Sequence, residues 1–118
     1  MLSRVFSEFI GTMFLLMIIV GSGIMAENLT SNQGIILLAN SLATVLGLIV
    51  LILMFGDISG GHFNPVVSTI FFMLKELPFK QFFLYLLAQT SGAILGVILA
   101  NIMFDLSFVE ISTRIEMA

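Results

Sequence analysis

Three long apolar stretches constrain this chain more than any other feature. Residues 5–25 contain a single charged side chain, Glu8, and residues 35–55 and 81–104 contain none. A helix needs about 20 consecutive apolar residues to cross the hydrocarbon core of a bilayer. The first stretch is longer than a signal-peptide core and carries an internal charge, so we expect it to be retained. We therefore predict an all-α membrane protein in which residues 1–118 form a single membrane domain with three transmembrane helices.

The composition excludes several classes of protein. Charged residues make up only 9% of the chain and the formal net charge is -3, so no basic surface is available to neutralise nucleic-acid phosphates. The chain has no cysteine and one histidine, which argues against disulfide frameworks and zinc sites. The sequence contains no recognisable nucleophile with an adjacent base, carboxylate pair or phosphate-binding loop. We therefore expect neither an enzyme nor a bound metal or cofactor.

A fourth apolar run, residues 63–74, is too short to span a membrane. A run of this length is a candidate for a re-entrant segment, which enters the bilayer and returns to the same face. Such a turn places Arg4, Lys75 and Lys80 on one face, whereas the opposite loop, residues 26–34, contains no Lys or Arg. The fourth basic residue, Arg114 in the tail, falls on the opposite face and is the exception. Because cytoplasmic loops are enriched in both residue types, this distribution favours the re-entrant course. We expect an integral protein of the plasma (inner) membrane with a cytoplasmic N-terminus.

Asn64 and Pro65 predict where a helix begins within this run. Asn is a favoured N-cap, and Pro is favoured at the first helical position. A helix over residues 65–74 is about 15 Å long, half of a roughly 30 Å hydrocarbon core, so its N-terminus is expected near the midplane. A helix N-terminus carries a partial positive charge and free N–H donors, which disfavours cations there.

We expect residues 59–63, which precede this helix, to be extended and to present carbonyl oxygens at membrane depth. Backbone of this kind is tolerated only where it is buried in protein or lines a water-filled cavity. A row of carbonyl acceptors that ends at the Asn64 amide can pass water or a hydroxylated solute along by hydrogen-bond exchange. The pattern indicates half of a pore for neutral solutes, although an Asn-Pro dipeptide is also typical of a simple interfacial turn.

Three motifs of the chain resemble those of a known family. Residues 57–68 (DISGGHFNPVVS) are similar to the first signature loop S-G-x-H-x-N-P-A-V of the aquaporin, or major intrinsic protein, channels. Residues 7–12 (SEFIGT) resemble the family's A-E-F-x-G-T, and residues 85–93 (YLLAQTSGA) resemble its Y-x-x-A-Q-x-x-G-A. The motifs occur in the family's order. The resemblance implies one aquaporin-like repeat: three transmembrane helices plus one re-entrant half-helix.

The resemblance also implies roles for individual residues. It implies that Asn64 faces the pore and that Glu8 and Gln89 are buried polar groups that brace the signature loop. It places a filter position, often aromatic in the family, at Thr44, where a small side chain leaves room for solutes larger than water. The candidate signature-motif residues are Gly60, Gly61, His62, Asn64, Pro65 and Val66.

Two motif residues raise questions of their own. Val66 stands where the family has alanine, which slightly enlarges the side chain at the constriction. His62 either lines the pore as a hydrogen-bonding group or is held in the loop by Glu8. No second His and no Cys is present to join it in a metal site.

The family's fold consists of two inverted repeats whose half-helices meet at the midplane, and only the first repeat is recognisable here. The sequence contains no second Asn-Pro motif with its following arginine. We therefore expect an aquaporin-like channel module for passive transport of water or small uncharged solutes such as glycerol. Its pore then needs a partner in the lipid bilayer: either a homo-oligomer with one copy inserted upside down or a separate chain that carries the second repeat. The alternative is a truncated membrane helix bundle that conducts nothing.

Small residues recur at four-residue intervals in the second and third predicted spans. Such rows let helix backbones approach closely in lipid, so we predict a tight contact between these two helices. Asn40 and Asn101 are polar groups in lipid that either hydrogen-bond across helices or face the lumen. The tail, residues 106–118, is either a short amphipathic segment or disordered. The small residues of the second predicted span are Ala39, Ala43 and Gly47, and those of the third are Ala88, Gly92, Gly96 and Ala100.

Overall fold

The computed structural model describes the backbone of residues 1–117 and the side chains of residues 1–104. All regular structure in this part of the chain is helical, and three of the helices are long and apolar enough to cross a membrane. The predicted class, an all-α protein with three spans and a short additional helix, is confirmed. The helices are α1 (Leu2–Leu29), α2 (Gln33–Ser59), α3 (Pro65–Met73) and α4 (Phe79–Met117).

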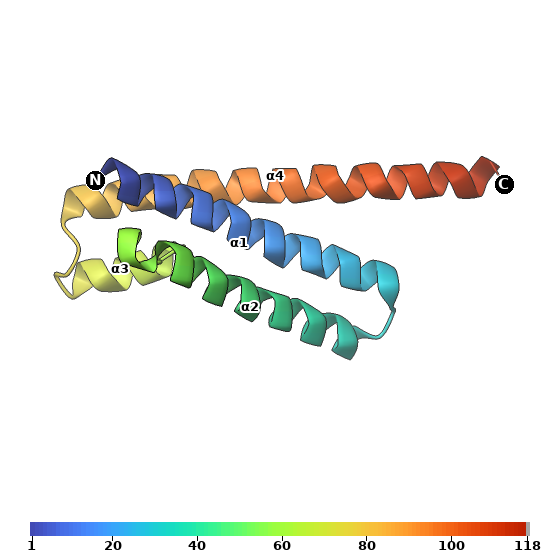
Figure 1. The fold of residues 1–118 in the computed structure, drawn as a ribbon, viewed down its shortest axis with the longest axis horizontal. Coiled ribbons are helices and arrows are strands. Elements are labelled where there is room, and N and C mark those ends of the chain that lie inside the picture. Colours follow the sequence, from blue (N-terminus) through green and yellow to red (C-terminus); the bar gives the residue numbers. More distant parts are fainter. Residues whose placement is uncertain (118) are drawn as a thin grey trace.

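The short helix α3 follows the course predicted for a re-entrant segment. α2 ends at the same end of the molecule as the N-terminus, and the chain turns inward before α3 begins (Figure 1). α3 then runs back to that end, where a loop leads into α4 (Figure 1). Asn64 is the N-cap of α3, Pro65 is its first residue and Leu74 caps its C-terminus. The helix has 9 residues, about 14 Å in length, so it reaches only about halfway across a hydrocarbon core.

α1 is the central helix and contacts both of the other long helices. It lies between α4 and α2 over most of its length (Figure 1). The predicted tight contact between the second and third spans is therefore wrong, because among the described elements α2 and α4 pack on α1 and not on each other.

The small residues nevertheless mark tight helix packing, with α1 as the partner. A Cβ atom on Gly92 of α4 would lie 2.5 Å from the backbone oxygen of Phe9. A Cβ atom on Gly47 of α2 would lie 2.7 Å from Ile18. Helices approach this closely only where a side chain is absent. A row of small residues thus identifies the face that packs tightly but does not identify the helix it packs against.

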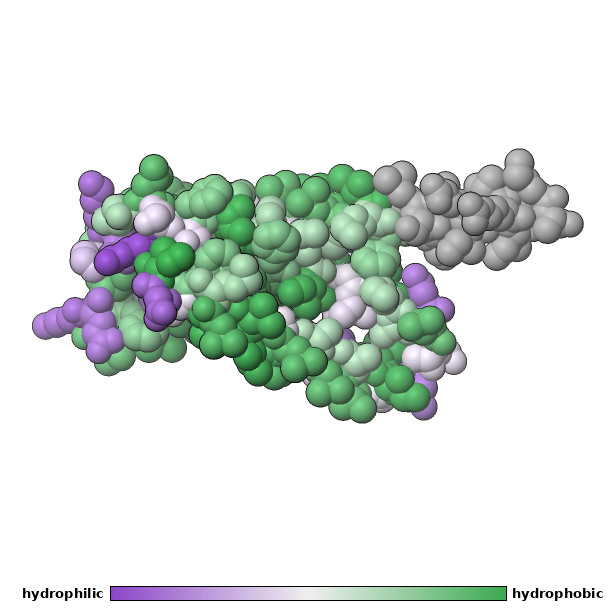
Figure 2. Space-filling view, viewed as in Figure 1, coloured by the Kyte–Doolittle hydropathy of each residue, from purple (hydrophilic) through white to green (hydrophobic). Residues whose placement is uncertain are grey.

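The outer surface of the long helices is apolar. Figure 2 shows apolar residues along the length of the visible face, with hydrophilic residues at the end that holds the N-terminus and around the α1–α2 loop. α2 exposes large apolar side chains along its length, as expected for contact with lipid chains. They include Leu38, Leu42, Leu46 and Leu53.

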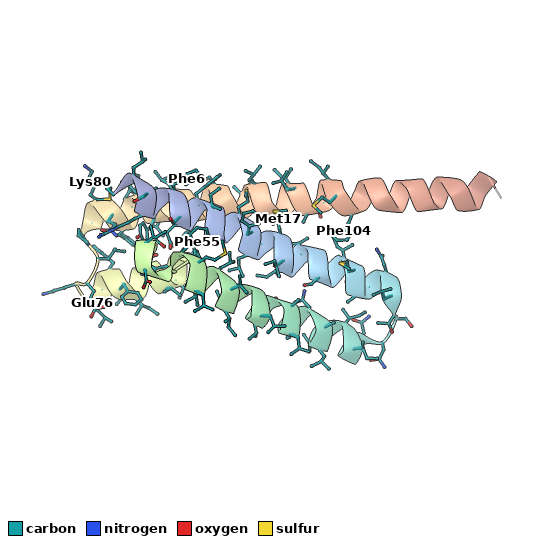
Figure 3. The ribbon with its side chains drawn as sticks, viewed as in Figure 1. Phe6, Met17, Phe55, Glu76, Lys80 and Phe104 are labelled. Carbon is teal, nitrogen blue, oxygen red and sulfur yellow. The ribbon has the colours of Figure 1, made fainter. Side chains whose placement is uncertain are left out.

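The basic residues of the first half of the sequence and of the α3–α4 loop lie at one end of the molecule. Arg4 is in the first turn of α1, beside the N-terminus. Glu76 and Lys80 lie at that same end (Figure 3), and Lys75 directly precedes Glu76 in the sequence. This is the charge distribution on which the re-entrant prediction rested.

α4 continues as a helix to Met117, beyond the end of α1 (Figure 1). The prediction for the tail, residues 106–118, otherwise falls outside the described side chains. Asn101 is exposed on α4.

Candidate functional site

The carboxylate of Glu8, on α1, is fully buried and accepts four hydrogen bonds. Its Oε2 accepts from the Ser59 hydroxyl at 2.6 Å and from the His62 backbone N–H at 3.1 Å. Its Oε1 accepts from the Phe63 backbone N–H at 2.8 Å and from Gln89 Nε2 at 2.8 Å. A buried charge is costly unless it is fully hydrogen-bonded, and these four neutral donors provide that compensation. Glu8 thereby connects α1 to the end of α2, to the loop before α3 and to α4.

The loop between α2 and α3 is a tight turn, so the prediction that residues 59–63 are extended is wrong. Ser59 is the last residue of α2, and Gly60, Gly61 and Phe63 have φ values of 96°, 66° and 52°. Glycine adopts such left-handed angles without strain, which explains the Gly-Gly pair. The turn directs two successive N–H groups at one carboxylate, whereas successive groups of an extended chain point in opposite directions.

The Phe63 side chain anchors the loop against α1 and α2. It is 2% exposed and packs with Leu15 and Leu51 in a small apolar core. A Cβ atom on Gly11 would lie 2.6 Å from Phe63 Cδ1, so glycine at this position makes room for the ring. Gly11 follows Glu8 by three residues and therefore shares its face of α1. The Glu-x-x-Gly spacing places the carboxylate and the space for the ring side by side.

Three polar side chains of α4 at four-residue spacing support the base of the loop. Gln81 Nε2 donates to the Tyr85 hydroxyl at 3.1 Å, and that hydroxyl donates to the Ser59 carbonyl oxygen at 2.6 Å. Tyr85 and Gln89 are both fully buried. The sequence interpretation used Tyr85 only as part of a motif and missed this contact. The sequence feature that indicates this contact is the row of polar residues at 81, 85 and 89 in an otherwise apolar stretch, because residues four apart share a helix face.

The His62 ring is held by α3. Its Nδ1 lies 2.8 Å from the Ser68 hydroxyl, which also accepts from Gln89 Nε2 at 2.9 Å. The ring stacks on Phe71 with centroids 4.7 Å apart. Burial lowers the pKa of His62 below its ordinary value of 6.5, and the Glu8 carboxylate opposes part of this shift. The structure thus brings Glu8, His62 and Gln89 into one network, in which Glu8 accepts from the His62 backbone rather than from its ring.

Asn64 is exposed at the inner tip of α3. Its Oδ1 accepts a hydrogen bond from the Val66 N–H at 2.8 Å, which caps the helix. Because only the amide oxygen can accept this bond, the NH2 group is the end that is available to a ligand. A cavity of about 350 Å³ between α1 and α4 borders Asn64 and Pro65. Val66 is 65% exposed, so most of its surface faces away from its neighbours in this chain.

Thr44 lies apart from this cluster. It is on α2, roughly 22 Å along the helix from Ser59 at the usual rise per residue. It is half-buried, and its hydroxyl donates to the backbone oxygen of Asn40 at 2.8 Å. The candidate filter position and the signature loop therefore lie at two different levels of the molecule.

Comparison with known proteins identifies the group to which these features belong. The model of the family described as Major intrinsic protein matches residues 1–116. The chain belongs to this family. Aquaporins and aquaglyceroporins, its relatives among curated proteins, match this MIP chain over nearly its whole length.

The chain is 42% identical to the Aquaglyceroporin AqpS of Rhizobium meliloti (strain 1021) over 113 residues, which are 96% of this chain and 48% of the relative. It is 32% identical to the Probable aquaporin NIP4-2 of Arabidopsis thaliana over 88% of this chain and 36% of the relative. Aquaporin NIP3-1 of Arabidopsis thaliana is 34% identical over 87% of this chain and 31% of the relative. The MIP chain thus spans about half or less of the length of these relatives. No solved structure gives a significant match.

Proposed function

We propose that this MIP chain is a channel module for the passive transport of water or small uncharged solutes, and not an enzyme. One observation carries the proposal: the Asn64 amide, oriented by its own cap, presents hydrogen-bond donors at the inner tip of a re-entrant helix. The positive end of the helix dipole lies at the same place. Both features favour the oxygen atom of a neutral solute and disfavour a cation.

The Glu8 network supports this proposal because it fixes the position of the Asn64 tip. Glu8 and Gln89 act as bracing groups, and Phe63, next to Asn64, is held by both a hydrogen bond and packing. A donor that is held in place loses little conformational freedom when a solute binds. Asn64, proposed to contact solute, is exposed, whereas Glu8 and Gln89, proposed to brace it, are buried.

We extend the proposal to solutes of glycerol size. Thr44 at the candidate filter position is small, which leaves space beyond that needed for water. The name of the relative AqpS, an aquaglyceroporin, agrees with this range. A larger opening admits both solutes, so we expect the protein to conduct glycerol as well as water.

The pore needs a second half, and we propose that it comes from a second repeat on a separate chain or from a second copy of this one within the bilayer. The chain matches only 48% of the length of AqpS. Asn64 and Val66 are exposed, so the tip of α3 is free to meet a partner. We place the protein in the plasma membrane. Its N-terminus faces the cytoplasm in this proposal, because Arg4 and Lys80 lie at the same end of the molecule and cytoplasmic ends are enriched in basic residues.

Stopped-flow light scattering on proteoliposomes tests the function. We expect faster shrinkage than in empty liposomes under an osmotic gradient, followed by re-swelling as glycerol enters. Permeability equal to that of empty liposomes, both for the chain alone and for the chain assembled with its second half, would show a non-conducting helix bundle instead.

Replacing Asn64 by aspartate tests the NH2 group as a donor to solute while keeping the oxygen that caps α3. Asp caps a helix as well as Asn does, but it cannot donate and it adds a negative charge. We expect α3 to remain and permeability to water and glycerol to fall by about tenfold, the effect of about 1.4 kcal/mol on the barrier. The flux assay measures the loss, and circular dichroism verifies the helix content. Unchanged flux in N64D would mean that solutes do not contact this amide.

A further inference from the structure

Asn40 forms a hydrogen-bonded connection between α2 and α1. Its Nδ2 donates to the backbone oxygen of Ile19 at 2.7 Å and to the Ser22 hydroxyl at 3.1 Å. A Cβ atom on Gly23 would lie 3.1 Å from the same nitrogen, so glycine there gives the amide close access to α1. Of the two roles that the sequence leaves open for Asn40, the structure therefore shows the bond between helices.

Thr44 lies between this bond and a second contact with α1. It is one turn after Asn40 on the same face of α2, and its hydroxyl donates to the Asn40 backbone oxygen. Three residues further on is Gly47, where a Cβ atom would meet Ile18 Cδ1 at 2.7 Å. A hydrogen bond on one side of Thr44 and close packing on the other thus determine the distance between α1 and α2 at the level of Thr44.

We propose that Asn40 is a positioning residue for solute selectivity. Its amide holds α1 and α2 together beside Thr44 and so sets the width of the opening at that position. The inference rests on the proposed channel function. Leucine has the same branched shape as asparagine but cannot donate, so Asn40→Leu removes the connection without leaving an unpaired polar group in lipid. Its methyl group also needs more room than the 2.7 Å that separates the amide nitrogen from the Ile19 oxygen, which moves the helices apart. Without the bond the opening widens, which favours glycerol over water.

The test measures the water and glycerol permeability of proteoliposomes that contain the chain assembled with its second half. In N40L we expect the ratio of glycerol to water permeability to rise about threefold, a factor that corresponds to one interhelical hydrogen bond of typical strength in a membrane. Ser22→Ala removes one of the two acceptors and is expected to raise the ratio less. Ser91→Ala removes a hydroxyl that is exposed on α4 and whose hydrogen bonds stay within its own helix, so it is expected to leave the ratio unchanged.

Each outcome bears on a different claim. A wild type that conducts neither solute contradicts the channel function itself. A conducting wild type with an unchanged ratio in N40L contradicts this inference alone, as does an equal loss of both permeabilities, which a merely structural residue would produce. If N40L does not fold, Gly47→Ala separates the helices from the other side of Thr44 while keeping the Asn40 bond. We expect the same direction of change in G47A, and no change there contradicts the inference.

Discussion

Replacing Glu8 by leucine is expected to unfold the signature loop and to abolish permeability. Leucine removes the acceptor of four donors, three of which form fully buried hydrogen bonds with Glu8, and each buried donor left without a partner costs about 1–3 kcal/mol. Because the loop can rearrange to satisfy some of them, we expect the free energy of unfolding to fall by at least about 3 kcal/mol. Tyr85 is the one tyrosine of the chain and is bonded to the base of the loop, so its near-ultraviolet circular dichroism reports the change directly.

Two further variants make the Glu8 result specific. Glu27 is an exposed carboxylate on the same helix, and Glu27→Gln is expected to leave both the tyrosine signal and the flux unchanged. Glu8→Gln keeps one acceptor oxygen but turns an NH2 group toward loop donors, so we expect an intermediate loss. A wild-type tyrosine signal in E8L would show that the loop holds its shape without the carboxylate.

The second large effect is expected from Gly92→Val. The added Cβ would lie 2.5 Å from the Phe9 backbone oxygen, which cannot rotate away as a flexible side chain can. α4 must then move away from α1, and it carries Tyr85 and Gln89 away from the loop with it. We expect a loss of about 3 kcal/mol, the upper end of the usual cost of overpacking, together with loss of flux. Thermal unfolding followed by circular dichroism measures the first effect.

Gly56→Ala is the matched control for this glycine. A Cβ atom there would lie 3.6 Å from the Ile52 side chain, an ordinary van der Waals distance. Since alanine is the better helix former, we expect G56A to stabilise the protein slightly, by about 0.5–1 kcal/mol. If G56A and G92V lowered the unfolding temperature equally, tight packing between α1 and α4 would not explain the second result.

The sequence predicted those parts of the fold that depend on local chemistry. Asn64 and Pro65 mark the start of α3 because an N-cap and a first-turn proline act within three residues of themselves. The three spans were recognisable because their length must match the bilayer. The charges of Arg4, Lys75 and Lys80 indicated the reversal of the chain, because basic residues are enriched on the cytoplasmic side of a membrane.

The parts that the sequence did not reveal depend on contacts between distant segments. The rows around Gly47 and Gly92 show which helix faces pack tightly, but nothing in them specifies α1 as the shared partner. Asn40 and Tyr85 donate to backbone carbonyl oxygens, which every residue has, so their partners leave no mark in the sequence. The turn before α3 escaped prediction because its course depends on where the Glu8 carboxylate lies.

The network around Glu8 also has a consequence for biosynthesis. Gln89 lies 16 positions after Met73, the last residue of α3, so the ribosome completes the half-helix before this α4 support exists. At roughly 5–20 residues per second, the delay is about one to three seconds. During that interval the half-helix lacks its α4 supports and is free to slip out of the bilayer or be threaded fully across it. Correct topogenesis of the segment therefore depends on how the insertion machinery retains it until the last span arrives.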